Sequence, residues 1–503
     1  MIPIFSIPLA IAFPLVEGAL ALRLIEGSTP VLYRIERWAM GFLLGCTMSA
    51  FIIFFAVFFG VPLTLFGFLC VHVAILATLM VLRYKMFPYA FPDSPKLVLP
   101  SIKSMRKALP RWVLILGFWM ILWTALKIGL GGYDIFSVPS YWDDSYANWN
   151  MRSKIMYENE SLMLEEPRTS DVFFGGRAEG YPLTVYFTKI WFVMVNGEWN
   201  EAVVNGISYI WFLAFLICFF LALLRAECRD DSACSRSPNA FAWSALATYV
   251  LVSVPLFLVQ GTNPYSDVFM ASHLFFVIYF FYQWMDSTLR VKGIEEGRRV
   301  HRDEPSQTRV WLHLFGFSTA LMLFVKNEAF MIFLPPLFVV MVLFCIFALH
   351  QSLRSDAGLR AFGAWFGPIL VIAVPWLTFK FFYDLGFGNN RSVAGSLSLS
   401  PNSEVLKAIE GDLLYTGSFM LLFPLTLLVL VITWRRWIKS SLGLIILFIG
   451  IVFVGECMIY YLVPSMATEA IRHTGFGRGM IHLVPGIVFV VILLLKDLIE
   501  GES

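Results

Sequence analysis

Residues 112–130 read WVLILGFWMILWTALKIGL, an apolar run whose one charged residue is Lys127. A helix of this length spans about 30 Å, the thickness of the hydrocarbon core of a bilayer. A basic segment precedes this run and an acidic, aromatic-rich segment follows it. The run therefore predicts a transmembrane helix whose two ends meet chemically different loops.

The composition extends this prediction to the whole chain. Hydrophobic residues make up 58% and charged residues 14% of the 503 residues, and the mean hydropathy is +0.74. Soluble domains carry roughly 25% charged residues. The net charge of +2 gives no indication of a nucleic-acid partner.

We expect an all-α, polytopic membrane protein of about thirteen spans, near residues 1–22, 38–60, 61–82, 112–130, 203–224, 240–258, 265–285, 310–325, 329–350, 363–383, 413–433, 441–463 and 481–495.

The distribution of lysine and arginine predicts the orientation of these spans. One loop holds seven basic residues against a single acid, Asp93: Arg83, Lys85, Lys96, Lys103, Arg106, Lys107 and Arg111. Basic loops lie on the cytoplasmic side of membranes, so the large loop 131–183 is expected on the extracytoplasmic side. The same rule puts the N-terminus outside and the C-terminus in the cytoplasm, in a membrane that we expect to be a bacterial plasma membrane.

The stretch Pro182–Val195 decides whether this orientation holds for the later loops. It is short for a crossing and carries Lys189 in its middle. If it crossed the bilayer, the basic loops that follow would be placed outside. We therefore interpret it as an embedded half-helix on the outer side.

The loop 131–183 contains the first candidate site, Tyr141-Trp142-Asp143-Asp144-Ser145-Tyr146-Ala147-Asn148-Trp149. Two adjacent carboxylates at a membrane boundary indicate a role beyond solubility. Further polar residues fall on the same predicted side. Asp267 opens a span after Asn263 and Pro264, where helix capping explains it equally well. Lys326 and Glu328 interrupt an apolar stretch, which a tight turn with a lysine reaching the interface would also explain.

The segment 469–482 is the third outer cluster. It combines three glycines, Arg472, Arg478, His473 and His482, and this composition suits an anion such as phosphate, although interfacial anchoring is the alternative. The outer loop 384–412 contains Arg391 and has the composition of a segment that covers a substrate or of a plain linker. Among the seven scattered cysteines we expect neither a disulfide nor a Cys-based metal site.

Acids and cations at one membrane face suggest group transfer from a lipid-phosphate donor. A carboxylate can take the proton of an attacking hydroxyl, and arginine or lysine can stabilise the departing phosphate. The expected substrate-binding residues are Tyr146, Trp149, Lys189, Asp267, Lys326, Glu328, Arg391, Arg472, His473 and Arg478. No cofactor is required, and a divalent metal held by outer-loop acids stays an open alternative.

These motifs resemble the GT-C superfamily of integral-membrane glycosyltransferases, in particular bacterial relatives of the protein O-mannosyltransferases and of the lipid A aminoarabinose transferases. The resemblance rests on Trp142-Asp143-Asp144-Ser145-Tyr146, on Gly180-Tyr181-Pro182-Leu183, and on the order of Asp267, Lys326 and Arg472 or Arg478. It implies one integral-membrane domain over 1–503, with N-terminal spans and a basic loop (1–111), a catalytic module (112–350) and C-terminal spans with outer loops (351–503).

The resemblance also implies an inverting transferase that uses a polyprenyl-phosphate-linked sugar and a glycan, lipid or protein acceptor among membrane lipids. Asp143 is then the general base and Asp144 orients the acceptor or supports Asp143, although the two roles could be reversed. The alternatives are a transporter or flippase of a lipid-linked saccharide, and a polysaccharide polymerase or ligase with a pyrophosphate-linked donor. Which sugar is transferred does not follow from the sequence.

Overall fold

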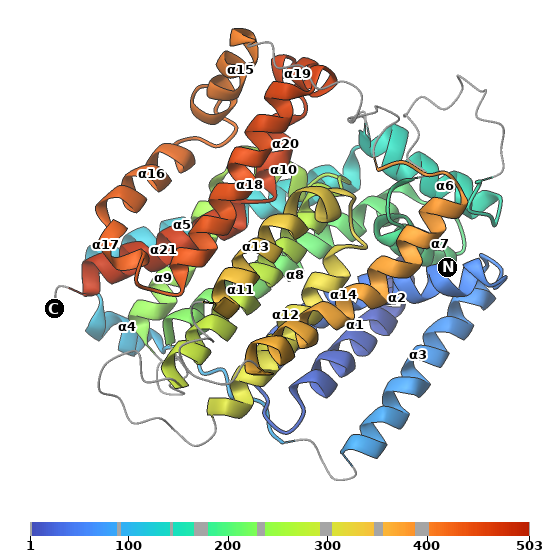
Figure 1. The fold of residues 1–503 in the computed structure, drawn as a ribbon, viewed down its shortest axis with the longest axis horizontal. Helices are drawn as coiled ribbons and strands as arrows, with labels where there is room; N and C mark the ends of the chain where they lie inside the picture. The colour runs from blue at the N-terminus through green and yellow to red at the C-terminus, as the bar shows by residue number, and fades with distance from the viewer. Residues whose placement is uncertain are drawn as a thin grey trace.

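The computed structural model describes residues 3–87, 92–140, 144–164, 180–228, 237–291, 304–346, 356–387 and 402–501. Every regular element within these ranges is a helix, and long helices lie side by side through the molecule (Figure 1). The predicted all-α class is confirmed. Asp143 and Arg391 fall outside the described residues.

The helices follow the predicted apolar runs closely. The first half of the chain forms α1 (Pro3–Glu26), α2 (Arg34–Phe58), α3 (Leu65–Met86), α4 (Ile102–Ala108), α5 (Arg111–Ser137), the π-helix η1 (Ser145–Asn150), α6 (Met151–Glu158), α7 (Thr184–Asn196), α8 (Glu201–Cys228), α9 (Pro238–Ser253) and α10 (Pro255–Gly261). The second half forms α11 (Asp267–Val291), α12 (Glu304–Met322), the π-helix η4 (Ala329–Phe333), α13 (Leu334–Phe344), α14 (Asp356–Phe382), α15 (Ser403–Leu414), α16 (Leu422–Ile432), α17 (Trp434–Trp437), α18 (Leu442–Leu462), α19 (Pro464–Ile471), α20 (Phe476–Ile481) and α21 (Val484–Glu500).

Eight of the described helices are long and apolar enough to cross a bilayer, and α9 with α10 would make a ninth span, bent by 82°. The chain is thus a polytopic membrane protein. The remaining four predicted spans correspond to α12, to η4 with α13, to α16 and to α21, which lie outside this set of long apolar helices. The number thirteen therefore stays a prediction.

Helix α7 is the element that we interpreted as an embedded half-helix. It has 13 residues, about 20 Å, and ends at Gly197, whose φ of 91° favours glycine. Every residue of α7 is buried, and the helix packs against α1, α2, α3 and α8. It is too short to cross a bilayer, and its surroundings are protein.

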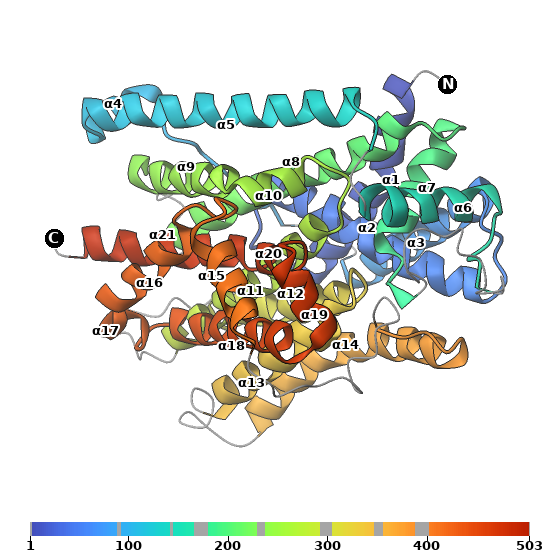
Figure 2. The ribbon, with the colours of Figure 1, turned by 90° about the horizontal axis from the view of Figure 1, so that it is seen from above.

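Burial varies strongly from one span to another. The α11 span lies wholly inside the protein, whereas only 6% of the most apolar part of α5 is buried. Figure 2 shows α5 along one side of the bundle, outside α8 and α9. Its many exposed aromatic and aliphatic side chains are compatible with lipid.

Small residues bring α1 and α2 into close contact. A Cβ atom placed on Gly18 would lie 1.9 Å from the carbonyl oxygen of Gly41, and one on Gly45 would lie 2.0 Å from the carbonyl oxygen of Pro14. Such close backbone approach is typical of helix pairs inside membranes. The glycines therefore fix the distance between the first two spans.

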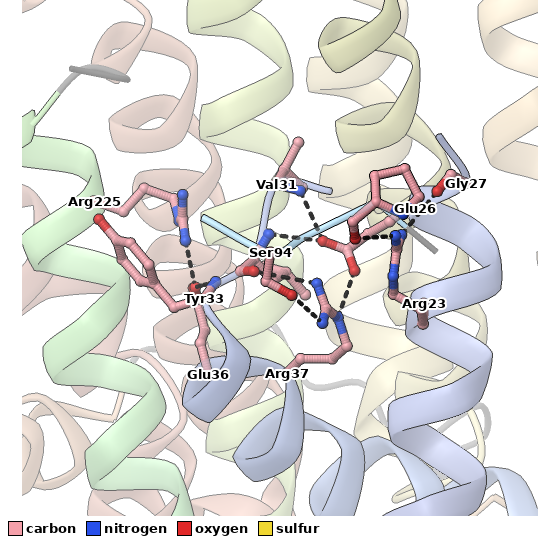
Figure 3. A network of polar contacts seen from close by, with 11 residues as sticks. Arg23, Glu26, Gly27, Val31, Tyr33, Glu36, Arg37, Ser94 and Arg225 are labelled. Carbon is pink, nitrogen blue, oxygen red and sulfur yellow. Dashed lines mark hydrogen bonds and ion pairs between the residues drawn. The ribbon is translucent and has the colours of Figure 1, made fainter. Parts of the chain in front are cut away.

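A buried network of charges ties the ends of α1, α2 and α8 together (Figure 3). Glu26 accepts hydrogen bonds from the backbone N–H groups of Val31 and Leu32, at 2.8 and 2.7 Å, and pairs with Arg37 at 2.5 Å. Glu36 pairs with Arg225 at 2.7 Å. Each of these buried carboxylates thus has a cationic partner and further donors, which a buried charge requires.

The same network fixes the position of the basic loop. Arg23 donates to the carbonyl of Pro92, and Arg37 donates to Ser94 Oγ, each at 2.8 Å. Arg225 lies near the end of α8, and Asn205, near its start, hydrogen-bonds Asn150 of the large loop at 2.9 Å. These two positions on α8 are twenty residues apart, about 30 Å. The basic loop and the large loop therefore lie at opposite ends of the bundle.

The two termini also lie at different ends. Ser6 in α1 donates to Asn196 Oδ1 at 2.9 Å, next to the start of α8. Lys496 in α21 pairs with Glu227 at 3.4 Å, at the end of α8. The first helix thus begins at the end that holds the large loop, and the last helix ends beside the basic loop.

The Glu36–Arg225 pair yields a stability prediction. Arg225→Met should destabilise the protein by about 3–5 kcal/mol because Glu36 would remain charged and buried without its cation. Thermal unfolding of the purified protein in one detergent measures the change. Lys154→Met is the matched control, since Lys154 pairs with Glu158 across 3.7 Å on an exposed helix face and such pairs contribute about 0.5 kcal/mol or less. Equal melting temperatures for the two variants would contradict the prediction.

Candidate functional site

Asp267 lies at the centre of the polar cluster that we take as the candidate site. It is the first residue of α11 and is 1% exposed. Lys326 Nζ lies 2.8 Å from Oδ1, Arg478 Nε lies 3.1 Å from Oδ2, and His482 Nε2 lies 3.3 Å from Oδ1. The positive end of the α11 dipole also favours a carboxylate at this position. Capping thus explains only part of the role of Asp267, because groups from two distant segments converge on it.

Arg478 links this buried carboxylate to the large loop. Its Nη1 pairs with Asp144 while its Nε holds Asp267. Asp144 is partly exposed, with 41% of its side chain accessible, whereas Asp267 is enclosed. The guanidinium therefore connects the interior of the bundle to its surface. Asp144 and Arg478 are 334 positions apart in the chain, so this contact confirms that the large loop and the segment 469–482 share one end of the bundle.

Lys326 holds a second carboxylate, that of Glu328, at 3.0 Å. Burial by itself would lower the pKa of Lys326, but Asp267 and Glu328 raise it above its ordinary value. Burial raises the pKa of Glu328. The positive charge of Lys326 lowers this pKa, and the net shift is downward. Both side chains are therefore charged at neutral pH. Lys326 points into the cluster and does not extend to the interface.

His482 was noted in the sequence without a specific role, and it completes the shell around Asp267. Its Nδ1 is buried and has no partner among the described residues.

Aromatic rings form one wall beside these charges. Trp149 stacks on Tyr186 with ring centres 5.2 Å apart and meets Tyr181 edge-on at 5.6 Å. Burial raises the pKa of Tyr181, and the neighbouring Glu328 raises it further. Arg152 lies over the ring of Tyr186, 4.7 Å from its centre. Of the two aromatic residues predicted to bind substrate, Trp149 is buried in this wall and Tyr146 is exposed.

Lys189 is fully buried on α7 but does not join the Asp267 cluster. Its Nζ donates to Asn150 Oδ1 at 2.5 Å and to the carbonyl of Pro264 at 3.4 Å. Burial lowers the pKa of Lys189 to about 7. The amine thus connects η1 to the turn before Asp267 and helps to hold these two segments together.

Two residues of the third sequence cluster lie away from Asp267. His473 Nδ1 pairs with Asp412 of α15 at 2.7 Å, and Arg472 is exposed.

Sequence analysis also missed Lys380 at the end of α14, whose Nζ donates to the carbonyls of Gly180 and Gly386 at 2.6 and 2.7 Å. A lysine near the end of an apolar run was the available signal, the same one that identified Lys326.

The described part of the cluster holds three carboxylates and two cations in direct contact: Asp144, Asp267 and Glu328 with Lys326 and Arg478. Within the described residues no group of three His, Cys, Asp or Glu side chains has the arrangement of a metal site. The oxygens that would be the metal ligands are instead paired with lysine and arginine. All five charged side chains of the cluster thus take part in internal ion pairs.

Comparisons with protein-family models, with curated proteins and with solved structures found no match for this chain.

The Lys326–Glu328 pair predicts a dependence of stability on pH. A carboxyl group whose pKa is depressed by folding contributes stability above its unfolded pKa, and this contribution is lost as the pH falls through the folded value. The melting temperature of the wild type should therefore fall more steeply than that of Glu328→Gln below pH 4.5, the ordinary pKa of this group. Melting curves between pH 7 and about 3 measure this, with exposed Glu158→Gln as the control. Parallel curves for wild type and Glu328→Gln would contradict the assignment.

Proposed function

We propose that this protein is an inverting membrane glycosyltransferase of the GT-C type, which transfers a sugar from a polyprenyl-phosphate donor to an acceptor hydroxyl on the extracytoplasmic face. The observation that carries the proposal is the continuous chain Asp144–Arg478–Asp267–Lys326 at the end of the bundle opposite the basic loop. Cations suited to a phosphate thus lie beside the loop that contains the candidate base, which supports the proposal.

The proposed reaction is a single displacement. The acceptor oxygen bonds to the anomeric carbon, its proton passes to the carboxylate of Asp143, and the bond from that carbon to the phosphate oxygen breaks with its electron pair on the polyprenyl phosphate. Attack opposite the leaving group inverts the configuration. Asp143 directly precedes Asp144 in the sequence. The candidate base is therefore the neighbour in the chain of the residue that contacts Arg478.

The described contacts suggest how Arg478 serves a phosphate. Its Nε and Nη1 atoms hold Asp267 and Asp144, and among the described residues no contact occupies Nη2. A phosphate oxygen that replaces Asp144 on the guanidinium would gain a fork of two N–H donors. Release of Asp144 would return a free carboxylate to the loop beside the base, where it can orient the acceptor hydroxyl.

The buried carboxylate of Asp267 contacts both cations. Lys326 and Arg478 both depend on Asp267 for their position. Preorganised cations stabilise developing charge without the cost of reorganisation during the reaction. The aromatic wall of Trp149, Tyr181 and Tyr186 supplies apolar surface beside them and helps to exclude water.

An in vitro transfer assay tests the proposal. The purified protein is incubated with a panel of polyprenyl-phosphate sugars and mixed acceptors, and Asp143→Asn should lower turnover by about 10²- to 10⁴-fold while donor binding persists. Asp93→Asn, an exposed acid in the basic loop, should have no effect. Normal turnover of Asp143→Asn would reject this base. Absence of transfer with every donor, together with movement of a lipid-linked saccharide across vesicles, would favour the flippase alternative.

The orientation is tested by cysteine labelling in intact cells. With the native cysteines replaced by serine, Tyr146→Cys in η1 should react with a membrane-impermeant maleimide from outside, because η1 belongs to the proposed extracytoplasmic end. Lys103→Cys in α4 should react only after permeabilisation. Both native residues are exposed. A difference in labelling between the two cysteines therefore reports the side of the membrane on which each one lies. Labelling of both cysteines from the same side would refute the proposed topology.

A further inference from the structure

A cavity separate from the Asp267 cluster lies between α15 and α19. It is a shallow hollow, open to solvent over most of its extent, with a volume of about 460 Å³. Polar lining comes from Glu404, Lys407, Thr416 and His473, and apolar lining includes Tyr415 and Ile471. The proposed transfer step uses none of these residues.

Asp412 and His473 form a positioned pair at this cavity. Asp412 is 4% exposed, and its Oδ1 lies 2.7 Å from Nδ1 of His473. A carboxylate only accepts, so Nδ1 is the donor in this contact, and in the uncharged form of the ring Nε2 is left as an acceptor. His473 itself is half-exposed and lines the cavity. The imidazole therefore offers an oriented acceptor to a ligand hydroxyl.

The backbone supports the same position of the ring. His473 has a φ of 56°, a conformation that histidine adopts more often than most residues but that still costs free energy. Gly411 lies below the ring, and a Cβ atom added there would be 3.6 Å from His473 Cε1. The hydrogen bond with Asp412 and the packing over Gly411 thus hold the ring of His473 in place. They also compensate for a backbone conformation of His473 that is otherwise unfavourable.

The charges of the lining favour a neutral ligand. Glu404 and Lys407 carry opposite charges, and the imidazole is not needed as a cation for its contact with Asp412. An anion site would instead show an excess of arginine and lysine. Hydroxyl groups, an oriented acceptor and the flat ring of Tyr415 match a saccharide, which presents both hydroxyls and apolar C–H faces.

The cavity is close to the proposed reaction centre. His473 and Arg478 are five residues apart in the chain, so their Cα atoms are separated by at most about 18 Å. Helix α15 packs against both α19 and α20, and α20 carries Arg478. A ligand several sugar units long could occupy both places at once.

We propose that the cavity between α15 and α19 is a subsite for a neutral saccharide, the distal part of the acceptor, which hydrogen-bonds His473 as positioned by Asp412. This assignment rests on the proposed transferase function. Binding there would add affinity from a part of the acceptor that does not react, and this affinity can hold the reacting hydroxyl at Asp143.

Saturation-transfer NMR on the purified protein without donor tests the subsite. The probes are maltotriose, cellotriose, mannotriose and chitotriose, with inorganic phosphate as the anionic competitor. We expect at least one trisaccharide to bind the wild type, and His473→Asn to weaken that binding at least tenfold, since asparagine tolerates the same backbone conformation but lacks the imidazole Nε2. Thr474→Ala, next in the chain and outside the cavity lining, should bind like the wild type.

Each other result counts against the subsite. Absence of binding by all four trisaccharides, or equal binding by wild type and His473→Asn, would overturn it, and displacement by inorganic phosphate would replace the neutral ligand with an anion. The measurement needs neither donor nor turnover, so it is independent of the transfer assay. Where transfer is reconstituted, His473→Asn should raise the acceptor KM for long acceptors and leave kcat unchanged, which loss of folding would not do.

Discussion

Asp267 is a carboxylate buried at the start of a helix that itself lies wholly inside the protein. A charge in that position is strongly unfavourable unless cations and hydrogen-bond donors surround it. Lys326 from the turn after α12, and Arg478 and His482 from the segment before α21, supply them. The requirement of one buried charge therefore brings three regions of the chain together, and Arg478 extends the connection to Asp144 in the large loop.

The polar chemistry of this protein is concentrated at the two ends of an apolar bundle. At one end Glu26 and Glu36 are neutralised by Arg37 and Arg225, and the basic loop is attached to the same network. At the other end lie the Asp267 cluster and the large loop. Helix α8 separates the two by about the thickness of a hydrocarbon core. A catalytic site that uses a lipid-borne substrate needs this arrangement, because the reacting phosphate lies at the boundary between lipid and water.

The balance of charge in the candidate site has a chemical consequence. The described cluster holds three carboxylates, Asp144, Asp267 and Glu328, against two cations, Lys326 and Arg478, so both cations are already paired with carboxylates of the protein. In the proposed reaction, the donor phosphate would compete with the partly exposed Asp144 for Arg478, and the enclosed Asp267 would keep its contact. The two carboxylates on Arg478 thus differ in exposure, and under the proposed function this difference would let a donor phosphate replace Asp144 and leave Asp267 paired.

The class of the fold, most of the helix positions and several residues of the polar cluster could be predicted from the sequence alone. Long apolar runs form helices because a helix satisfies every backbone group within one segment of a bilayer, and polar residues within such runs are costly enough to be recognisable. Lys189, Asp267 and Lys326 were found by this signal, and the one at Lys380 was overlooked. Only the tertiary structure decided the pairings: Asp144 with Arg478, His482 with Asp267, and His473 with Asp412 of α15. Partners at such separations follow from how the helices pack, and the order of residues along the chain does not contain that information.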